Sequence, residues 1–304
     1  MKNTLQPLVS IVIITYNSSA YVLETLESAK AQTWKNVELI VTDDCSPDNT
    51  VEICKDWIEK NKERFIRTEL ITVPVNSCIS LNCNRGIKAS AGEWIKIIAG
   101  DDILKDNCIE DLLNFAVENP EADFIISDLE EIDNQSRPLL HKTTQDTGLR
   151  HFLKGKTAQE QLKNYARWPE FLNSPTFFFK KETMAAIGYY DDEFKIYDDM
   201  CLIFKINAFN KKIFYLDKST VKYRIHEHAI SRSSSKKIND KRDKEAYEIF
   251  KKYRKPHLSL LNPIDLSVYY ECWLYYRYKG FFGHKGIAVL NKFSLFYWYS
   301  RCFV

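Results

Sequence analysis

Short apolar, β-branched runs alternate with segments of helical spacing along the first half of the chain, and this alternation constrains the fold more than any other feature. The clearest run, Val9–Thr15, is apolar at nearly every position, as in a parallel strand buried on both faces. Strands are expected at residues 9–15, 37–41, 66–73, 94–99 and 123–128, and helices at 21–32, 50–61, 80–91 and 107–118. The pattern predicts an α/β fold with a mostly parallel central sheet flanked by helices.

The second half of the chain is less regular. Residues 137–168 are polar and mixed, which predicts a mobile loop and a short helix. Strands are expected at residues 176–179, 213–216 and 221–225, and a helix at 198–210. Three consecutive serines at 233–235 mark a change in composition. We therefore expect one domain at residues 1–232 and a helical extension at residues 233–304.

The extension is basic and rich in aromatic residues. It carries 14 Lys and Arg against six Asp and Glu, although the net charge of the whole chain is only +2. A charged helix is expected at residues 236–255, followed by an aromatic-rich segment. Aromatic and basic side chains together suit a membrane surface. Packing against the first domain, or against a second copy in a homodimer, explains the same pattern equally well.

The eight cysteines favour a reducing compartment. None forms a C-x-x-C pair, and no histidine cluster accompanies them, so they are interpreted as buried thiols. The first residues contain no signal-peptide core, and no run of 18 apolar residues occurs. The expected location is cytoplasmic, either free or peripheral on the inner face of the cell membrane.

Two adjacent carboxylates, Asp101 and Asp102, directly follow the strand expected at 94–99. In an open α/β sheet this is where ligands bind. Two like charges side by side need an offsetting charge, and Mg²⁺ commonly arrives there with substrate phosphates. An alternative is that the pair caps a helix.

Polar residues also follow the first two expected strands. Thr15, Tyr16 and Asn17 end the first, where an aromatic ring can stack on a nucleobase. Asp44 ends the second and could accept hydrogen bonds from a ribose or a base. No glycine-rich dinucleotide or phosphate loop follows either strand, so the sequence does not support those classes.

Three further motifs carry candidate chemistry. Arg85 is either an anion ligand near a phosphate or a surface partner of Glu93. Asp198 and Asp199 open a helix, where an acid is stabilised by the helix dipole or serves as a general base. Near the end of the first domain, Arg224, His226 and Arg232 could close over a diphosphate.

These motifs, in this order and approximate spacing, resemble those of family 2 glycosyltransferases with the GT-A fold, of the bacterial surface-polysaccharide type. The resemblance rests on five stretches and covers about residues 7–232: 9–17, 37–46, 84–102, 197–199 and 223–231. It implies a Rossmann-like nucleotide-binding half of the sheet and a divalent cation, Mn²⁺ or Mg²⁺.

The resemblance also implies site roles, which divide into nucleotide, metal and catalytic groups. Uridine would be held by Thr15, Tyr16, Asn17 and Asp44, with Arg85 near the nucleotide. Asp102 would bind the metal, Asp101 the ribose or donor sugar, and His226 the metal or the diphosphate. Asp199 would be the catalytic base, in a pair with Asp198. Two positions depart from the family pattern: Ala99 replaces its first acid, and Asp198 replaces a glutamate.

The function implied is inverting transfer of a sugar from a nucleotide-diphosphate donor, a UDP-hexose or UDP-N-acetylhexosamine, to a glycan hydroxyl. By family analogy the acceptor is a lipid-linked sugar in O-antigen or capsule biosynthesis, and no nucleic acid partner is expected. Two alternatives are a nucleotide-sugar-binding subunit without turnover and a sugar nucleotidyltransferase. The first gains support from Ala99, and the second is weakened by the missing glycine-rich loop.

Overall fold

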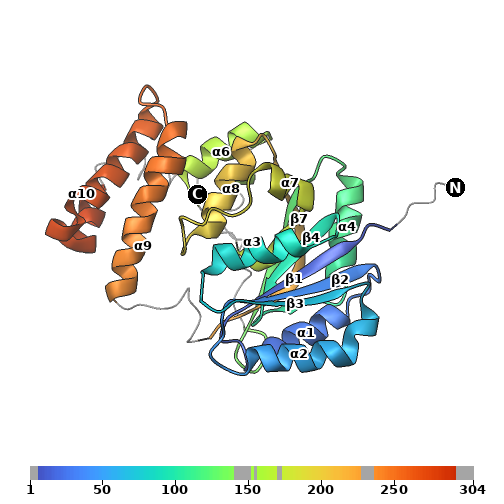
Figure 1. The fold of residues 1–304 in the computed structure, drawn as a ribbon. Helices are drawn as coiled ribbons and strands as arrows, with labels where there is room; N and C mark the ends of the chain where they lie inside the picture. Colours follow the sequence, from blue (N-terminus) through green and yellow to red (C-terminus); the bar gives the residue numbers. More distant parts are fainter. Residues whose placement is uncertain (1–5, 140–151, 154–155, 170–172, 227–235, 292–304) are drawn as a thin grey trace.

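The computed structural model describes residues 6–139, 152–153, 156–169, 173–226 and 236–291 (Figure 1). Most of these residues form an α/β unit around one eight-stranded sheet of order β3-β2-β1-β4-β7-β6-β8-β5. The strands are β1 (Val9–Thr15), β2 (Val37–Asp43), β3 (Thr68–Thr72), β4 (Trp94–Ala99), β5 (Ile103–Leu104), β6 (Phe124–Ile132), β7 (Phe178–Lys180) and β8 (Ile213–Arg224).

The sheet has a parallel half and a mixed half. Strands β3, β2, β1 and β4 are parallel, while β7 lies antiparallel between β4 and β6. Strand β8 is parallel to β6 and pairs with the short β5 in the antiparallel sense. The parallel half confirms the predicted Rossmann-like arrangement, and its carboxyl ends meet at one edge.

Helices cover both faces of the sheet. One face is covered by α1 (Val22–Lys30), α2 (Thr50–Asn61) and α4 (Cys108–Glu118). The other face is covered by α3 (Ile79–Ala89), α6 (Ala158–Arg167) and α8 (Asp198–Ala208). The short helix α7 (Lys181–Ala186) follows β7. Strand β1 serves both cores, because Ile11 and Ile13 join one cluster and Val12 the other. This two-sided burial explains why its sequence is continuously apolar.

Two local expectations were wrong. The strands expected at 213–216 and 221–225 are one strand, β8, whose register against β6 shifts near Asp128 and so absorbs the polar residues between them. The expected helix at 80–91 ends at Ala89. Gly92 lies beyond the helix and close to β1: a Cβ there would lie 2.5 Å from Ser10 Oγ and 2.6 Å from Ser10 N, so only glycine fits.

The helix expected within residues 137–168 is α6, whose start has a capping box between Thr157 and Glu160. The mobile loop expected in the same stretch falls mainly on residues 140–151 and 154–155, outside the described residues.

The extension is helical, as predicted. It comprises α9 (Lys236–Ile249), a π-helical turn (Phe250–Arg254), a short 3-10 turn (Lys255–His257) and α10 (Pro263–Asn291). Rings from α10 contact α9 and the π-helical turn, with Tyr247 and Tyr276 4.8 Å apart, and Figure 1 shows the two long helices together at one end of the molecule. None of the described helices is long and apolar enough to cross a membrane.

The extension also packs against the sheet-bearing unit. Ile249 joins Phe194 and Cys201 in a small buried cluster, and Tyr253 stacks on Phe204 with ring centres 5.8 Å apart. Arg167 of α6 forms an ion pair of 2.5 Å with buried Asp265 of α10. The division at residue 232 stays a prediction about folding units, but the two parts share a core.

Candidate functional site

The carboxyl ends of β1, β2 and β4 bring three of the predicted motifs to one edge of the sheet. Thr15 pairs in register with Asp43, and Ile14 pairs with Ala99. Asp44 follows β2 directly and Asp101 lies two residues after β4, so parallel pairing alone places these side chains in one neighbourhood.

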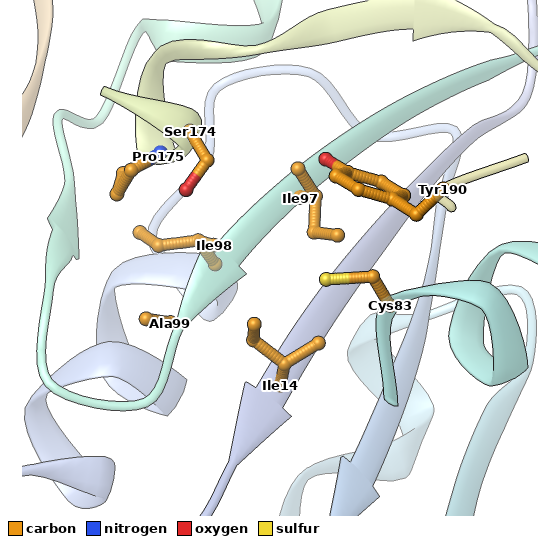
Figure 2. A pocket seen from close by; sticks show the side chains of 8 residues that line it. All are labelled: Ile14, Cys83, Ile97, Ile98, Ala99, Ser174, Pro175 and Tyr190. Atoms are coloured by element: carbon orange, nitrogen blue, oxygen red, sulfur yellow. The ribbon is translucent and has the colours of Figure 1, made fainter. Parts of the chain in front are cut away.

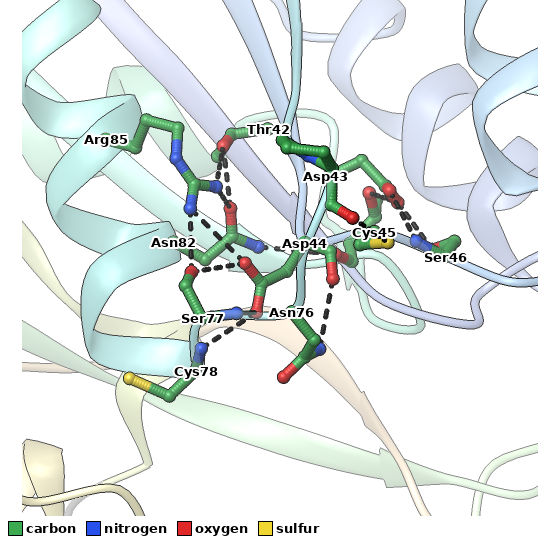
Figure 3. A network of polar contacts seen from close by, with 12 residues as sticks. Thr42, Asp43, Asp44, Cys45, Ser46, Asn76, Ser77, Cys78, Asn82 and Arg85 are labelled. Atoms are coloured by element: carbon green, nitrogen blue, oxygen red, sulfur yellow. Dashed lines mark hydrogen bonds and ion pairs between the residues drawn. The ribbon is translucent and has the colours of Figure 1, made fainter.

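Asp44 is the centre of a polar network at this edge (Figure 3). Its Oδ2 accepts hydrogen bonds from the backbone N–H groups of Ser77 and Cys78, both at 2.9 Å, and its Oδ1 pairs with Arg85 at 3.3 Å. Burial alone would raise the pKa of Asp44, but the hydrogen bonds from Ser77, Cys78 and Arg85 outweigh it and lower that pKa. Asp44 is therefore an ionised acceptor held in a fixed position.

Arg85 belongs to the same network. Besides Asp44 it donates to Ser77 Oγ at 2.7 Å and to Asn82 Oδ1 at 2.8 Å (Figure 3). Its ion pair is with Asp44, not with Glu93 as the alternative interpretation had it. Arg85 therefore orients the carboxylate of Asp44, and its role near a nucleotide stays a prediction.

Asp43, the residue that sequence reasoning passed over, organises the loop after β1. Its buried carboxylate accepts from Thr15 Oγ1 at 2.8 Å and from Ser46 N and Oγ at 2.8 and 2.5 Å. Ser46 Oγ in turn accepts from Asn17 N, which lies in the left-handed region with φ of 54°. Tyr16, between Thr15 and Asn17 in the chain, is 51% exposed, so its ring is available to a ligand. The only feature of the sequence that could have indicated this role of Asp43 is that it stands next to Asp44.

The two members of the Asp101–Asp102 pair have different surroundings: Asp101 is partly exposed and Asp102 is buried. Asp101 Oδ2 lies 3.0 Å from His226 Nε2 at the end of β8. Asp102 is 1% exposed, and its Oδ1 accepts from the backbone N–H of Arg224 at 2.8 Å. Its Oδ2 has no hydrogen-bond partner within the described part of the chain. Burial, followed by the neighbouring charge of Asp101, raises the pKa of Asp102 well above its usual value.

Arg224 stabilises the turn that carries Asp101 and Asp102. The sequence suggested that Arg224 could bind a diphosphate, and the structure corrects that interpretation. The side chain is buried, and its guanidinium donates to Asp101 O at 2.8 Å, to Asp133 O at 3.1 Å and to Glu24 Oε2 at 3.0 Å. All these acceptors are protein groups, so the arginine holds the turn after β4 against β8. Arg232, expected beside it, lies outside the described residues.

The residues at this turn fit a divalent cation. No three His, Cys, Asp or Glu side chains of the described residues gather as a metal-binding group. Mg²⁺, however, usually takes only one or two carboxylates and completes its shell with waters and substrate phosphates. The carboxylate oxygens of Asp101 and the unpaired Oδ2 of Asp102 are ligand types that suit Mg²⁺ or Mn²⁺, and the imidazole of His226 lies beside Asp101.

Asp198 and Asp199 form a second acid site at the start of α8. Asp198 is buried, and burial together with the charge of Asp199 raises its pKa to about 8. Asp199 is half-buried and accepts from Met200 N at 2.6 Å; burial raises its pKa to about 6. At neutral pH Asp199 is the ionised member of the pair, which suits a general base.

A pocket lies beside the carboxyl end of β4 (Figure 2). It holds about 220 Å³ of empty space including its open mouth, and eight residues line it: Ile14, Cys83, Ile97, Ile98, Ala99, Ser174, Pro175 and Tyr190. Ala99 belongs to the edge that carries Asp101, whereas the charge of Asp198 acts on Cys83 and Tyr190, whose pKa values rise first through burial. The hydroxyl of Tyr190, a residue only 3% exposed, has no partner within the described residues.

Similarity to known proteins defines the protein family of this chain. The family model described as Glycosyl transferase family 2 matches residues 10–184, more than half of the chain. The chain therefore belongs to glycosyl transferase family 2.

Two relatives from bacteria match most of the chain. The chain is 28% identical over 234 residues to glycosyltransferase GlyG of Streptococcus pneumoniae, covering 74% of this chain and 73% of GlyG. It is 26% identical to the minor teichoic acid biosynthesis protein GgaB of Bacillus subtilis over 76% of this chain, but it spans only 24% of GgaB.

Solved structures support the same fold. TarS of S. aureus in complex with UDP-GlcNAc superposes with a TM-score of 0.62 at 20% identity, over 90% of this chain and 75% of that one. The mannosyltransferase PcManGT of Pyrobaculum calidifontis, in complex with GDP-Man and Mn²⁺, gives 0.61 at 14% identity, over 94% of this chain and 74% of that one. The predicted GT-A fold is confirmed.

Proposed function

We propose that this glycosyltransferase is an inverting, metal-dependent enzyme that moves a hexose or N-acetylhexosamine from a UDP-sugar to a hydroxyl of a glycan acceptor. One observation carries the proposal: Asp101 pairs with His226 after β4, and a second acid, Asp199 at the start of α8, has a pKa raised to about 6. A diphosphate-binding pair and a separate general base suit a single displacement.

The nucleotide would occupy the edge of β1 and β2. Asp44 is ionised and held in place by Arg85, so it can accept a hydrogen bond from the base. Tyr16 is exposed beside it and can stack on the ring, while Thr15 and Asn17 shape the loop. The complex of TarS with UDP-GlcNAc is consistent with a UDP-sugar donor.

The geometry favours a different division of the metal site from the one expected. We propose that Asp101 and His226 hold the cation, because they are paired just past the end of β8 and the side chain of Asp101 is 32% exposed. Asp102 was expected to be the ligand, but it is 1% exposed and its Oδ1 anchors the backbone of Arg224, which leaves only the unpaired Oδ2 as a secondary ligand. When bound, Mn²⁺ or Mg²⁺ would neutralise the charge that develops on the departing diphosphate.

The chain's own residues would act on the acceptor. Asp199 would take the proton from the acceptor hydroxyl as that oxygen attacks the anomeric carbon from the face opposite the diphosphate. A positioned base of this kind contributes about 10²–10⁴-fold. Inversion follows from the single displacement, and no carboxylate nucleophile is required, in contrast to a retaining glycosidase.

The acceptor proposal rests on relatives and on the extension. GgaB is named for minor teichoic acid biosynthesis, so a surface polysaccharide such as O-antigen or capsule, built on a lipid-linked sugar, is the acceptor class we propose. Trp273, Tyr270 and Tyr278 of α10 are exposed, which suits contact with a membrane surface on the cytoplasmic side. Contact with a second copy of the chain is the competing use of the same face.

The Asp199→Asn variant tests the proposal. It keeps the shape of the side chain but cannot accept the proton, so transfer from UDP-GlcNAc, UDP-Glc and related donors should fall by at least about 10²-fold. Affinity for UDP, measured by calorimetry, should stay unchanged. Transfer at the wild-type rate would contradict the assignment of Asp199 as base.

Product analysis separates the alternatives. Metal-stimulated release of UDP by the purified wild-type chain would exclude a binding subunit without turnover. Release of pyrophosphate instead of UDP would indicate a nucleotidyltransferase.

A further inference from the structure

We propose that Glu245, on helix α9 of the extension, is a positioning residue for the catalytic acid pair. The carboxylate of Glu245 reaches back across the molecule to the loop that enters α8. Its Oε1 accepts from the backbone N–H groups of Ile196 at 2.7 Å and of Tyr197 at 2.9 Å. These are the last two residues before Asp198, so one oxygen fixes the start of the helix that carries Asp198 and Asp199.

The loop has little local means of holding this position. Tyr197, the N-cap residue of α8, makes no side-chain cap hydrogen bond. Backbone N–H groups at the start of a helix need partners from elsewhere, and a carboxylate there is also favoured by the helix dipole. Glu245 is 48 residues further along the chain, and it supplies the acceptor that the local sequence lacks.

Neighbouring residues of the extension hold the same loop at other points. Lys252 forms ion pairs of 2.7 Å with both Asp191 and Glu193, and Tyr253 Oη donates to Asp191. Ile249 packs in the buried cluster with Phe194. The segment from Asp191 to Tyr197 is thus fastened to the extension along its whole length, and Glu245 makes the contact nearest the acid pair.

The negative charge of Glu245 also favours a neutral Asp198. It is one of the groups that, after burial and the charge of Asp199, raise the pKa of Asp198. A neutral Asp198 leaves Asp199 as the ionised member of the pair. The extension would therefore complete the active site as well as stabilise the fold.

This inference rests on the proposed role of Asp199, and its test distinguishes the two. Glu245→Met keeps the approximate size of the side chain but removes the acceptor, whereas Glu245→Gln retains a carbonyl oxygen that can accept the same hydrogen bonds. Glu248→Met, one turn along on α9 and paired with Lys251, is the matched control. Each variant is assayed below the onset of its own unfolding, followed by circular dichroism.

We expect Glu245→Met to lower kcat by about ten- to a hundredfold, since a displacement of about 1 Å in a catalytic group costs on that order. The KM for the UDP-sugar and the Kd for UDP should stay within about twofold, because Glu245 bonds to Ile196 and Tyr197, which are not among the residues proposed to hold the nucleotide. Glu245→Gln should restore most of kcat, and Glu248→Met should leave it unchanged.

Several results would overturn the inference. Wild-type kcat in Glu245→Met, with Asp199→Asn inactive, would show that Glu245 does not position the pair while leaving the proposed function intact. Equal losses in the Gln and Met variants would also reject it, because the hydrogen-bond acceptor would then be irrelevant. An active Asp199→Asn enzyme would instead remove the proposed function itself.

Discussion

At the scale of single residues, the candidate site is built from three pairs of adjacent aspartates whose members have different surroundings. Asp43 holds the loop after β1, while its neighbour Asp44 holds the loop before α3. Asp102 lies against the Arg224 backbone, while Asp101 meets His226. In these two pairs each carboxylate has its own partners, so a doubled acid can serve the structure with one carboxylate and leave the other for a ligand.

The Asp101–Asp102 pair provides a direct test of this division. Asp101→Asn should weaken Mn²⁺ binding in the presence of UDP by at least about tenfold, because it removes a charged ligand. Asp102→Asn should change that affinity little, since its Oδ1 can still accept from Arg224 N. Electron paramagnetic resonance of Mn²⁺ would measure both. The opposite ranking would restore Asp102 as the principal metal ligand.

The raised pKa of Asp199 predicts a pH dependence. A general base must be ionised, and the pKa of this carboxyl is about 6. Below that value kcat should fall about tenfold per pH unit, and above it the rate should level off. Asp198→Asn should leave this limb in place, because Asp198, with a pKa of about 8, is still protonated where Asp199 titrates. A rate that stays constant far below pH 6 would exclude Asp199 as the base.

At the scale of elements, the sheet edge that carries the site depends on close approach between β1 and the turn before β4. Gly92 donates to Ser10 Oγ at 2.9 Å and to Glu38 Oε1 at 3.1 Å. The same turn starts β4, whose far end bears Asp101. An error in the position of this turn would therefore shift the register of β4 against β1.

Gly92→Ala should destabilise the protein. The added Cβ meets the Ser10 backbone at 2.6 Å, and overpacking of this kind costs about 1–3 kcal/mol. Thermal denaturation should show a melting temperature lower by several degrees. Adding Ser10→Ala should not rescue it, since the backbone nitrogen remains in the way. Full rescue in the double variant would place the conflict on the Ser10 hydroxyl alone.

At the scale of the whole molecule, the extension and the catalytic unit share apolar surface. Ile249 and Phe250 are almost fully buried, and each such side chain contributes about 1.5–3 kcal/mol when removed from water. Arg167 and Asp265 add an ion pair in which the acid is buried. These contacts bear on whether residues 1–232 form an independent unit.

A chain ending at residue 232 should therefore be less stable than the full chain. It loses the cover over Phe194 and Phe204, and we expect a lower melting temperature or aggregation, measured by differential scanning calorimetry. A chain ending after Tyr278 keeps these contacts and serves as the control. An unchanged melting temperature in the shorter chain would support independent domains.

Much of the fold could be predicted from sequence because it depends on local periodicity. The apolar run of β1 and the helical spacing of α2 are set by neighbours two to four residues apart, so both were located correctly. Strand β8 was divided wrongly because its continuity depends on a register shift against β6. The insertion of β7 between β4 and β6 likewise arises from pairing between distant segments.

By itself, the sequence determined the order of strands and helices, the class of fold, and the presence of acids at strand and helix ends. Only the tertiary structure decided what each acid contacts. Arg224 became a buried clamp, and Glu245 came to lie against the start of α8, through contacts 122 and 48 residues apart in the chain. The physical reason is that periodicity follows from near neighbours, whereas the charge and accessibility of a carboxylate depend on the distant groups that the fold packs around it.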